Sequence, residues 1–208
     1  LATAVLAVSA LYTDRHEEAV RLYEQALALA RAAARPRDAA STLDNLALAH
    51  KRMGDYDESL RLSLEALSQH RRNGDAAAIA VCLSNLGSLT MFLGKDDMAS
   101  AYLDEARQLS ERAGLVSTRA FVLANLSVLA KKARDDDRAR AHAERALEVA
   151  RASGMRQLAS WLEVQLARLA IRRGDLEEAR LRLAGGTVLA LALGVPPLRA
   201  EPLLAFVE

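Results

Sequence analysis

The 208-residue sequence contains one cysteine, four prolines and only 4% aromatic residues. A single cysteine excludes a disulfide within the chain and is typical of a reducing compartment. Cys82 shares its position in an internal repeat with Thr42, Val122 and Leu162. Because that position is mostly apolar, we expect a buried, unreactive thiol at Cys82 rather than a nucleophile.

The sequence also lacks an excess of charge of either sign and any long apolar run. Lys and Arg total 28 against 27 Asp and Glu, which leaves a formal net charge of +1. This balance argues against binding of nucleic acid or an anionic membrane. No apolar run approaches the roughly 18 residues of a membrane helix, and residues 1–10 lack the pattern of a signal peptide. We therefore expect a soluble, cytoplasmic protein.

What the sequence does contain is a repeat with a period of 40 residues. Asn45, Asn85 and Asn125 share one position, which Gln165 occupies in the next copy. Seven of the ten glycines fall at two further positions of the repeat, namely Gly54, Gly94 and Gly174 at one and Gly74, Gly114, Gly154 and Gly194 at the other. Self-similarity at this period indicates a solenoid, in which each unit buries its apolar face by stacking on its neighbours.

The spacing of apolar residues and glycines predicts an all-α, right-handed superhelical solenoid of antiparallel helix pairs. About five repeats are expected, over residues 1–35, 36–74, 75–114, 115–154 and 155–194. Residues 195–208 would begin a sixth, truncated repeat, and the chain would be a fragment of a longer protein. No terminal repeat has a polar outer face, so self-association through uncapped ends is also predicted.

Two turns in this scheme lead to separate predictions. Pro36 is expected to end the first helix pair, and Asp38 to cap the next helix. Arg134 replaces the glycine of the other corners, and the turn should be kept, at some strain if Arg134 must adopt a positive φ. The run Asp135–Asp137 that follows is read as a helix cap and first turn, because three consecutive carboxylates do not match a calcium loop.

The residues around the corners resemble the tetratricopeptide repeat. Asn85-Leu86-Gly87, Leu93-Gly94 and then Ala99, Tyr102 and Ala106 follow that family's order of small and large packing positions. The usual unit has about 34 residues and closes with a proline, whereas this unit has 40 and closes with a glycine. Elongated repeats of this kind are similar to those of bacterial signal-transduction regulators, quorum-peptide receptors and kinesin-light-chain adaptors. The resemblance implies binding of peptides, proteins or effectors and no catalytic centre in the repeats.

The sequence offers no motif for catalysis, a metal or a cofactor. The four histidines show no metal-binding spacing, and glycine-rich phosphate loops and the GxSxG motif are missing. An enzyme would need a deep pocket with converging titratable groups, and this remains the less favoured alternative.

If the chain is a binding module, we expect instead a concave groove lined by the first helix of each pair. The amides of Asn45, Asn85, Asn125 and Gln165 would grip the backbone of an extended peptide, because each amide both donates and accepts hydrogen bonds. Val81, Phe121 and Trp161 would provide apolar anchors. Acidic groups would be favoured by the basic residues Lys51, Arg52, Lys131, Lys132, Arg168 and Arg172.

The alternative for the amides is that they brace neighbouring helices, and the basic residues could simply complement helix dipoles. For function, the sequence favours a protein- or peptide-binding module within a larger bacterial regulator. The second alternative is a structural spacer or dimerisation arm without a ligand groove. No residue pattern in the sequence identifies the ligand.

Overall fold

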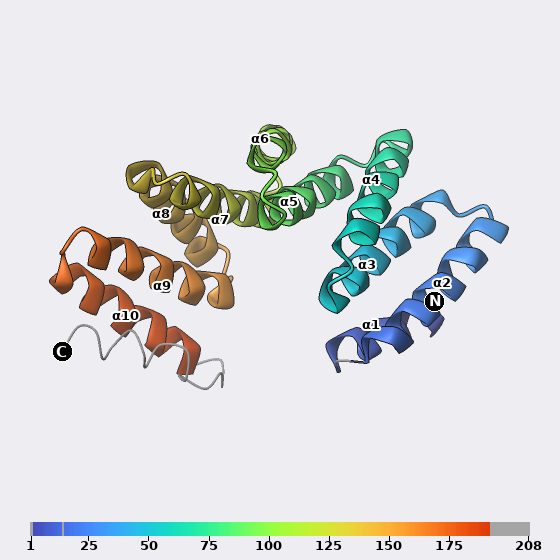
Figure 1. Cartoon of the computed structure of the whole chain (residues 1–208), viewed down its shortest axis with the longest axis horizontal. Coiled ribbons are helices and arrows are strands. Elements are labelled where there is room, and N and C mark those ends of the chain that lie inside the picture. The colour runs from blue at the N-terminus through green and yellow to red at the C-terminus, as the bar shows by residue number, and fades with distance from the viewer. Residues whose placement is uncertain (1, 14, 192–208) are drawn as a thin grey trace. The chain divides into compact units, whose positions relative to one another are not determined.

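The computed structural model describes residues 2–13 and 15–191, and these form ten α-helices without a strand (Figure 1). The helices are α1 (Ala2–Tyr12), α2 (His16–Ala32), α3 (Pro36–Met53), α4 (Tyr56–Asn73), α5 (Ala76–Phe92), α6 (Asp96–Arg112), α7 (Val116–Lys132), α8 (Asp136–Ala152), α9 (Arg156–Arg172) and α10 (Leu176–Leu191). The expected all-α fold of consecutive helix pairs is confirmed. Residues 195–208, the expected sixth repeat, lie outside the described residues.

The 40-residue period reappears in the helix boundaries. Helices α3, α5, α7 and α9 begin at residues 36, 76, 116 and 156, and α4, α6, α8 and α10 begin at residues 56, 96, 136 and 176. A break between two helices falls at each of the expected corners Gly54, Gly74, Gly94, Gly114, Arg134, Gly154 and Gly174. We keep the division into five repeats as an interpretation of these spacings.

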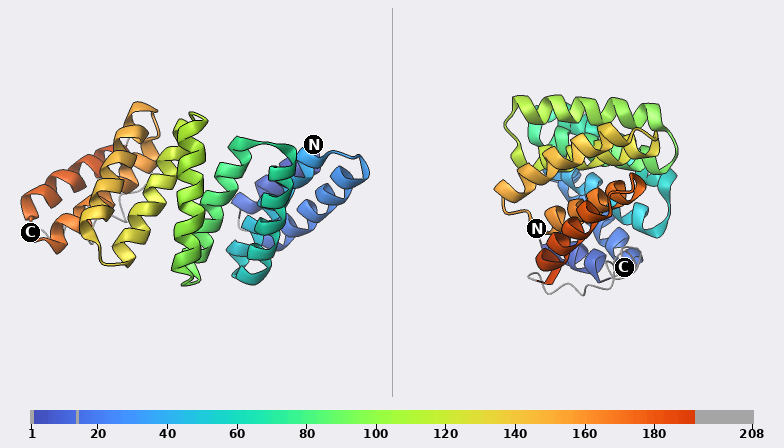
Figure 2. Two further views of the ribbon diagram at one scale, coloured as in Figure 1. Left: turned by 90° about the horizontal axis from the view of Figure 1, so that it is seen from above. Right: turned by 90° about the vertical axis from the view of Figure 1, so that its left-hand side faces the viewer.

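The chain divides into two compact units, one up to Leu109 and one from Ser110. In the first unit α1 packs on α2, α2 on α3, α3 on α4 and α4 on α5. In the second unit α7 packs on α8, α8 on α9 and α9 on α10. Figure 2 shows α9 and α10 side by side again from two further directions.

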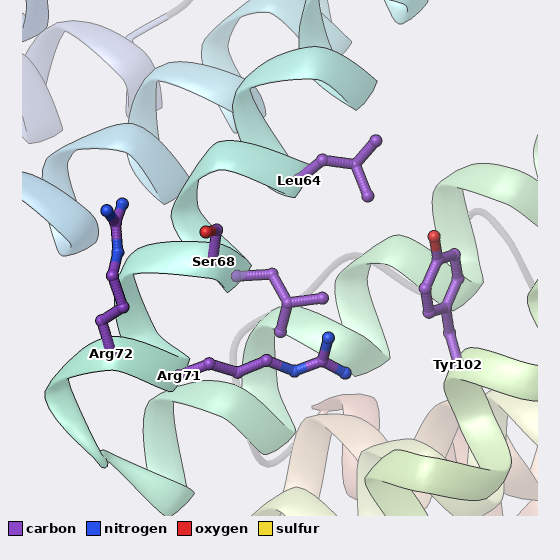
Figure 3. A pocket seen from close by; sticks show the side chains of 6 residues that line it. Leu64, Ser68, Arg71, Arg72 and Tyr102 are labelled. Carbon is purple, nitrogen blue, oxygen red and sulfur yellow. The ribbon is translucent and has the colours of Figure 1, made fainter.

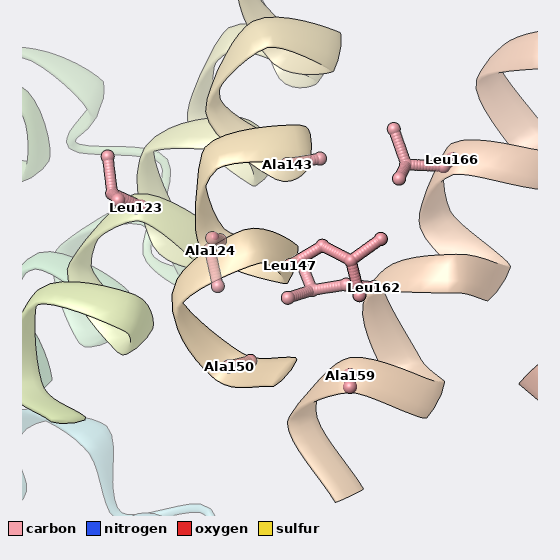
Figure 4. Packing of buried hydrophobic residues seen from close by; sticks show 9 residues of the cluster. Leu123, Ala124, Ala143, Leu147, Ala150, Ala159, Leu162 and Leu166 are labelled. Carbon is pink, nitrogen blue, oxygen red and sulfur yellow. The ribbon is translucent and has the colours of Figure 1, made fainter. Parts of the chain in front are cut away.

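The core of the second unit illustrates how three consecutive helices share one apolar layer. Its buried residues are Leu123 and Ala124 of α7, Ala143, Ala146, Leu147 and Ala150 of α8, and Ala159, Leu162 and Leu166 of α9. Leu147 and Leu162 point toward one another across α8 and α9 (Figure 4). Burial of each such leucine contributes about 1.5–3 kcal/mol, so α8 is stabilised from both of its neighbours.

Aspartate caps begin several helices. Asp55, Asp75, Asp135 and Asp175 each accept a hydrogen bond from the backbone N–H three residues later, at 3.4, 3.0, 3.0 and 2.9 Å. Each cap satisfies one of the N–H groups that lack an intrahelical partner. The prediction of a cap at Asp135 is confirmed. Asp136 pairs with Arg172 at the end of α9, and Asp137 pairs with Arg173, which follows that helix.

The prediction at Pro36 was wrong. Pro36 is the first residue of α3 rather than a helix terminator, and the break lies before it, where Ala34 has φ of 52°. Proline is favoured at this position because its missing N–H would have no intrahelical partner in any case. Asp38 lies in the first turn of α3, and the capping position is held by Arg35 without a side-chain hydrogen bond.

The strain predicted at Arg134 is present. Its φ is 64°, whereas Gly54, Gly94 and Gly174 hold the same left-handed conformation at the equivalent corners. A residue with a Cβ costs about 1–2 kcal/mol in that region. Glycine avoids this cost, but the greater freedom that it gives the unfolded chain offsets part of the stabilisation.

We therefore expect Arg134→Gly to raise the free energy of unfolding by about 0.5–1 kcal/mol in urea denaturation. Ala133→Gly is the matched control, because Ala133 has φ of −73° and gains no relief from glycine. An Arg134→Gly protein no more stable than the parent would show that this corner stores no strain.

Candidate functional site: the first-helix face

We define the first-helix face as the side chains outside the core on α3 and α5 of the first unit and on α7 and α9 of the second. Its apolar members stay accessible although the same helices bury leucines on their other side. Val81, Phe121 and Trp161 are 45%, 50% and 40% exposed. Large exposed apolar groups that recur at one repeat position indicate a surface suited to contacts with another molecule.

In the first unit, two long hydrogen bonds made from this face connect three helices. Lys51 Nζ of α3 donates to Ser88 Oγ of α5 at 3.5 Å, and Arg52 Nη1 donates to the Leu11 carbonyl of α1 at 3.4 Å. Burial lowers the pKa of Lys51. The first helices of this unit therefore lie next to one another, as a groove along them requires.

In the second unit a shorter contact joins α7 to α9. Lys131 Nζ donates to Gln165 Oε1 at 2.8 Å. The pKa of Lys131 is lowered by burial first, and then by the positive charges of Arg168 and Arg172, which Asp136 partly offsets. Asp136 also pairs with Arg172 at 3.2 Å. Three cations thus share one patch with a single nearby carboxylate, and an acidic ligand would reduce their repulsion.

The four amides predicted to form a ladder lie in different surroundings and in both units. Asn45 and Asn85 belong to the first unit, where Asn45 is half-buried and Asn85 exposed. Asn125 is half-buried, but Gln165 is only 6% exposed and its oxygen already accepts from Lys131. Gln165 therefore has a bracing contact, and the role of the ladder in binding stays a prediction. Lys132, also on the predicted groove, is exposed.

A buried polar cluster in the first unit was not found from the sequence. His70 Nε2 of α4 lies 2.6 Å from Asp44 Oδ2 of α3, and the Asp44 carboxylate also acts electrostatically on Cys82 of α5. Burial raises the pKa of Asp44, and burial and Asp44 together raise that of the Cys82 thiol. Cys82 also donates to the Ser63 carbonyl at 3.4 Å. A buried thiol that is harder to ionise is a poor nucleophile, as the apolar repeat position predicted.

The second helices carry a pocket of about 500 Å³ in the first unit. Leu64 and Ser68 of α4 lie on one side and Tyr102 of α6 on the other, with the Arg71 guanidinium between them (Figure 3). Arg71 is held by Glu105 at 2.7 Å. This pocket uses none of the residues predicted to bind a ligand.

Residues 2–13 and 15–191 contain no group of three or more His, Cys, Asp or Glu side chains placed to hold a metal ion. No helix among them combines the length and the apolar character needed to cross a membrane.

Comparison with family models gives two overlapping matches to the tetratricopeptide repeat, over residues 1–68 and 38–112. Together they span residues 1–112, which is more than half of the 208 residues. The chain belongs to the tetratricopeptide repeat (TPR) family. A search of curated proteins found no match.

Solved structures share the TPR architecture over nearly the whole chain. BtubC (BKLC) from P. vanneervenii is 25% identical, with a TM-score of 0.78 over 92% of this chain and 80% of that one. Aspartyl phosphate phosphatase F from Bacillus subtilis is 13% identical, with a TM-score of 0.81 over 92% and 50%. The Rap conjugation gene regulator of plasmid pLS20, in complex with the Phr* peptide, is 16% identical, with a TM-score of 0.77 over 92% and 53%. The chain therefore spans about half the length of the latter two proteins.

The cause assigned to the pKa of Lys131 leads to a direct test. Arg168→Ala removes a neighbouring positive charge, so we expect the pKa of Lys131 to rise toward its ordinary value. Side-chain NMR titration of lysine measures the change. Lys51 is the internal control, because burial alone lowers its pKa. Equal shifts at both lysines, or no shift at Lys131, would contradict the proposed electrostatic patch.

Proposed function

We propose that this TPR chain is a scaffold that binds a protein or an extended peptide along the first-helix face. The observation that carries the proposal is the exposure of Phe121 and Trp161 at the same place in two successive first helices of the second unit, and of Val81 at that repeat position in the first unit. Such apolar anchors suit side chains of an extended peptide, while amides beside them suit its backbone.

The second unit adds a preference for acidic ligands to this proposal. Lys131, Arg168 and Arg172 repel one another, and burial already disfavours the charged form of Lys131. A carboxylate from a ligand would favour the charged form of Lys131 and reduce the repulsion among the three side chains. We therefore propose a ligand segment with acidic residues next to apolar ones.

The pLS20 conjugation gene regulator, which has a similar fold, is solved in complex with a peptide. This likeness supports a peptide as the class of ligand. We further propose that the chain serves a larger bacterial regulator in the cytoplasm, with no nucleic acid bound by these repeats and no catalytic or cofactor role. The near-neutral charge and the buried thiol of Cys82 support these proposals. The likeness to a phosphatase at 13% identity concerns the fold alone.

A spacer or dimerisation arm is the competing proposal, in which the ends of the array make the contacts. It predicts self-association that is unaffected by substitutions on the first-helix face. Sedimentation alone does not separate the two, because self-association through uncapped ends is compatible with both; peptide binding that depends on the first-helix face is expected only of the scaffold.

We expect the double substitution Asn85→Ala with Asn125→Ala to weaken peptide binding about tenfold or more, since each lost hydrogen bond is worth roughly 0.5–1.5 kcal/mol. The probe is a peptide selected against the whole chain from a random display library, and fluorescence anisotropy gives its affinity. The melting temperature should barely change.

Asp57→Ala, an exposed substitution on α4, is the matched control and should leave the affinity unaltered. If the double variant loses much of its stability and keeps its affinity, the amides brace the scaffold and the ladder is not a binding element.

A further inference from the structure

A second crevice, of about 230 Å³, lies between α7 and α8 and uses none of the residues predicted to bind a ligand on the first-helix face. Its apolar wall includes Val116, Leu123 and Val149, and its charged groups are Arg119, Arg145 and Glu148. The volume is below the roughly 300–1,000 Å³ of pockets for drug-sized ligands, so only a small molecule or one side chain fits.

Both arginines of the crevice depart from the repeat of this chain. The positions equivalent to Arg119 in other copies hold Ala39, Ile79 and Ala159. Arg119 therefore places a guanidinium where a small or apolar side chain is sufficient for helix packing. Packing does not explain its presence.

Arg145 reverses the charge found at its position in the first unit. Glu65 and Glu105 stand there, and each accepts a hydrogen bond from an arginine of the preceding second helix, at 2.7 Å in both cases. In the second helix before Arg145, the position of that arginine holds Glu111, so both members of the pair change sign. No hydrogen bond or ion pair joins Glu111 to Arg145 in the described part of the chain. The two departures place two positive charges in the same crevice.

Neither guanidinium has a partner within residues 2–13 and 15–191. Nε of Arg119 is buried and makes no hydrogen bond there, and no ion pair of Arg145 occurs in the same part of the chain. By contrast, Arg140 and Arg182 of the same unit pair with Glu178 at 2.7 and 3.2 Å. A buried N–H without an acceptor is unfavourable, and an anion in the crevice would supply the acceptor.

We propose that this crevice binds a small carboxylate that carries a short apolar chain. Two arginines and one glutamate leave a formal charge of +1, which matches a monoanion better than a dianion. The planar guanidinium groups suit a carboxylate, and the apolar wall accommodates the chain. Glu148 faces the same space and opposes the anion, so its charge weakens binding.

The test is an NMR titration of the full chain with 4-methylpentanoate at constant ionic strength. We expect saturable shifts confined to the amides of residues 116–123 and 145–153. The neutral 4-methylpentanamide and inorganic phosphate, as separate probes, should bind at least about tenfold more weakly, because each lacks one of the two recognised features.

The repeat itself supplies variants that should fold. Arg119→Ala copies Ala39 and Ala159, and Arg145→Glu copies Glu65 and Glu105. Each should weaken 4-methylpentanoate binding at least about tenfold, since each removes a charge-assisted contact. Glu148→Gln, which copies Gln108, should strengthen binding severalfold. Arg138→Ala, at an exposed position of α8 outside the crevice, should have no effect.

Any of three results would overturn the proposal. They are no saturable shift in the parent chain, equal binding of 4-methylpentanamide or phosphate, and unchanged affinity in both Arg119→Ala and Arg145→Glu. Circular dichroism of each variant confirms that it is folded. The exposed position of Arg145 keeps the test decisive even if Arg119→Ala disturbs packing.

Discussion

Close contact between helices through small residues is the constraint on which the rest of this structure depends. Each second helix presents a small, buried residue at one repeat position, in a column formed by Ala19, Ser59, Ala99, Ala139 and Ala179. The first helix α5 approaches α6 closely as well, because a Cβ on Gly87 would lie 2.6 Å from Leu103 Cγ. A larger side chain at such a point would separate the helices and expose the leucines that they bury together. The side chains at these contacts therefore stay small in every repeat, while residues at other positions vary in charge and size.

That division explains which features could be predicted from the sequence. The helices and the strained corner at Arg134 follow from apolar spacing and glycine positions, which are local properties. Pro36 was misread because proline both ends helices and begins them, and the choice depended on the conformation of Ala34. The contact between Asp44 and His70 joins residues 26 apart on two helices, and a repeat pattern cannot show it because other copies lack the pair. The burial of Gln165 depends likewise on its neighbour Lys131.

Departures from the repeat are where this chain differs from a generic TPR scaffold. Glu163 is 2% exposed at a position where Leu43, Leu83 and Leu123 form the core of other copies. Its carboxylate pairs with Arg151 and Arg182, and Gly186 packs against its Cβ, where a Cβ of its own would be 3.3 Å away. A buried ion pair adds little stability compared with a leucine, because desolvation offsets the attraction. We find no stabilising reason for the change at Glu163, and the repeat position alone would have predicted leucine.

The claim that ligands bind along the first helices is tested most directly by site-specific photo-crosslinking. A p-benzoylphenylalanine residue is placed at Phe121 or Trp161 on the first-helix face, or at Leu181, which is 74% exposed on the second helix α10. Each protein is irradiated with a peptide selected against the whole chain and analysed by mass spectrometry. Crosslinks from positions 121 and 161 with none from 181 are the predicted result. Crosslinks from position 181 with none from the other two would contradict the account.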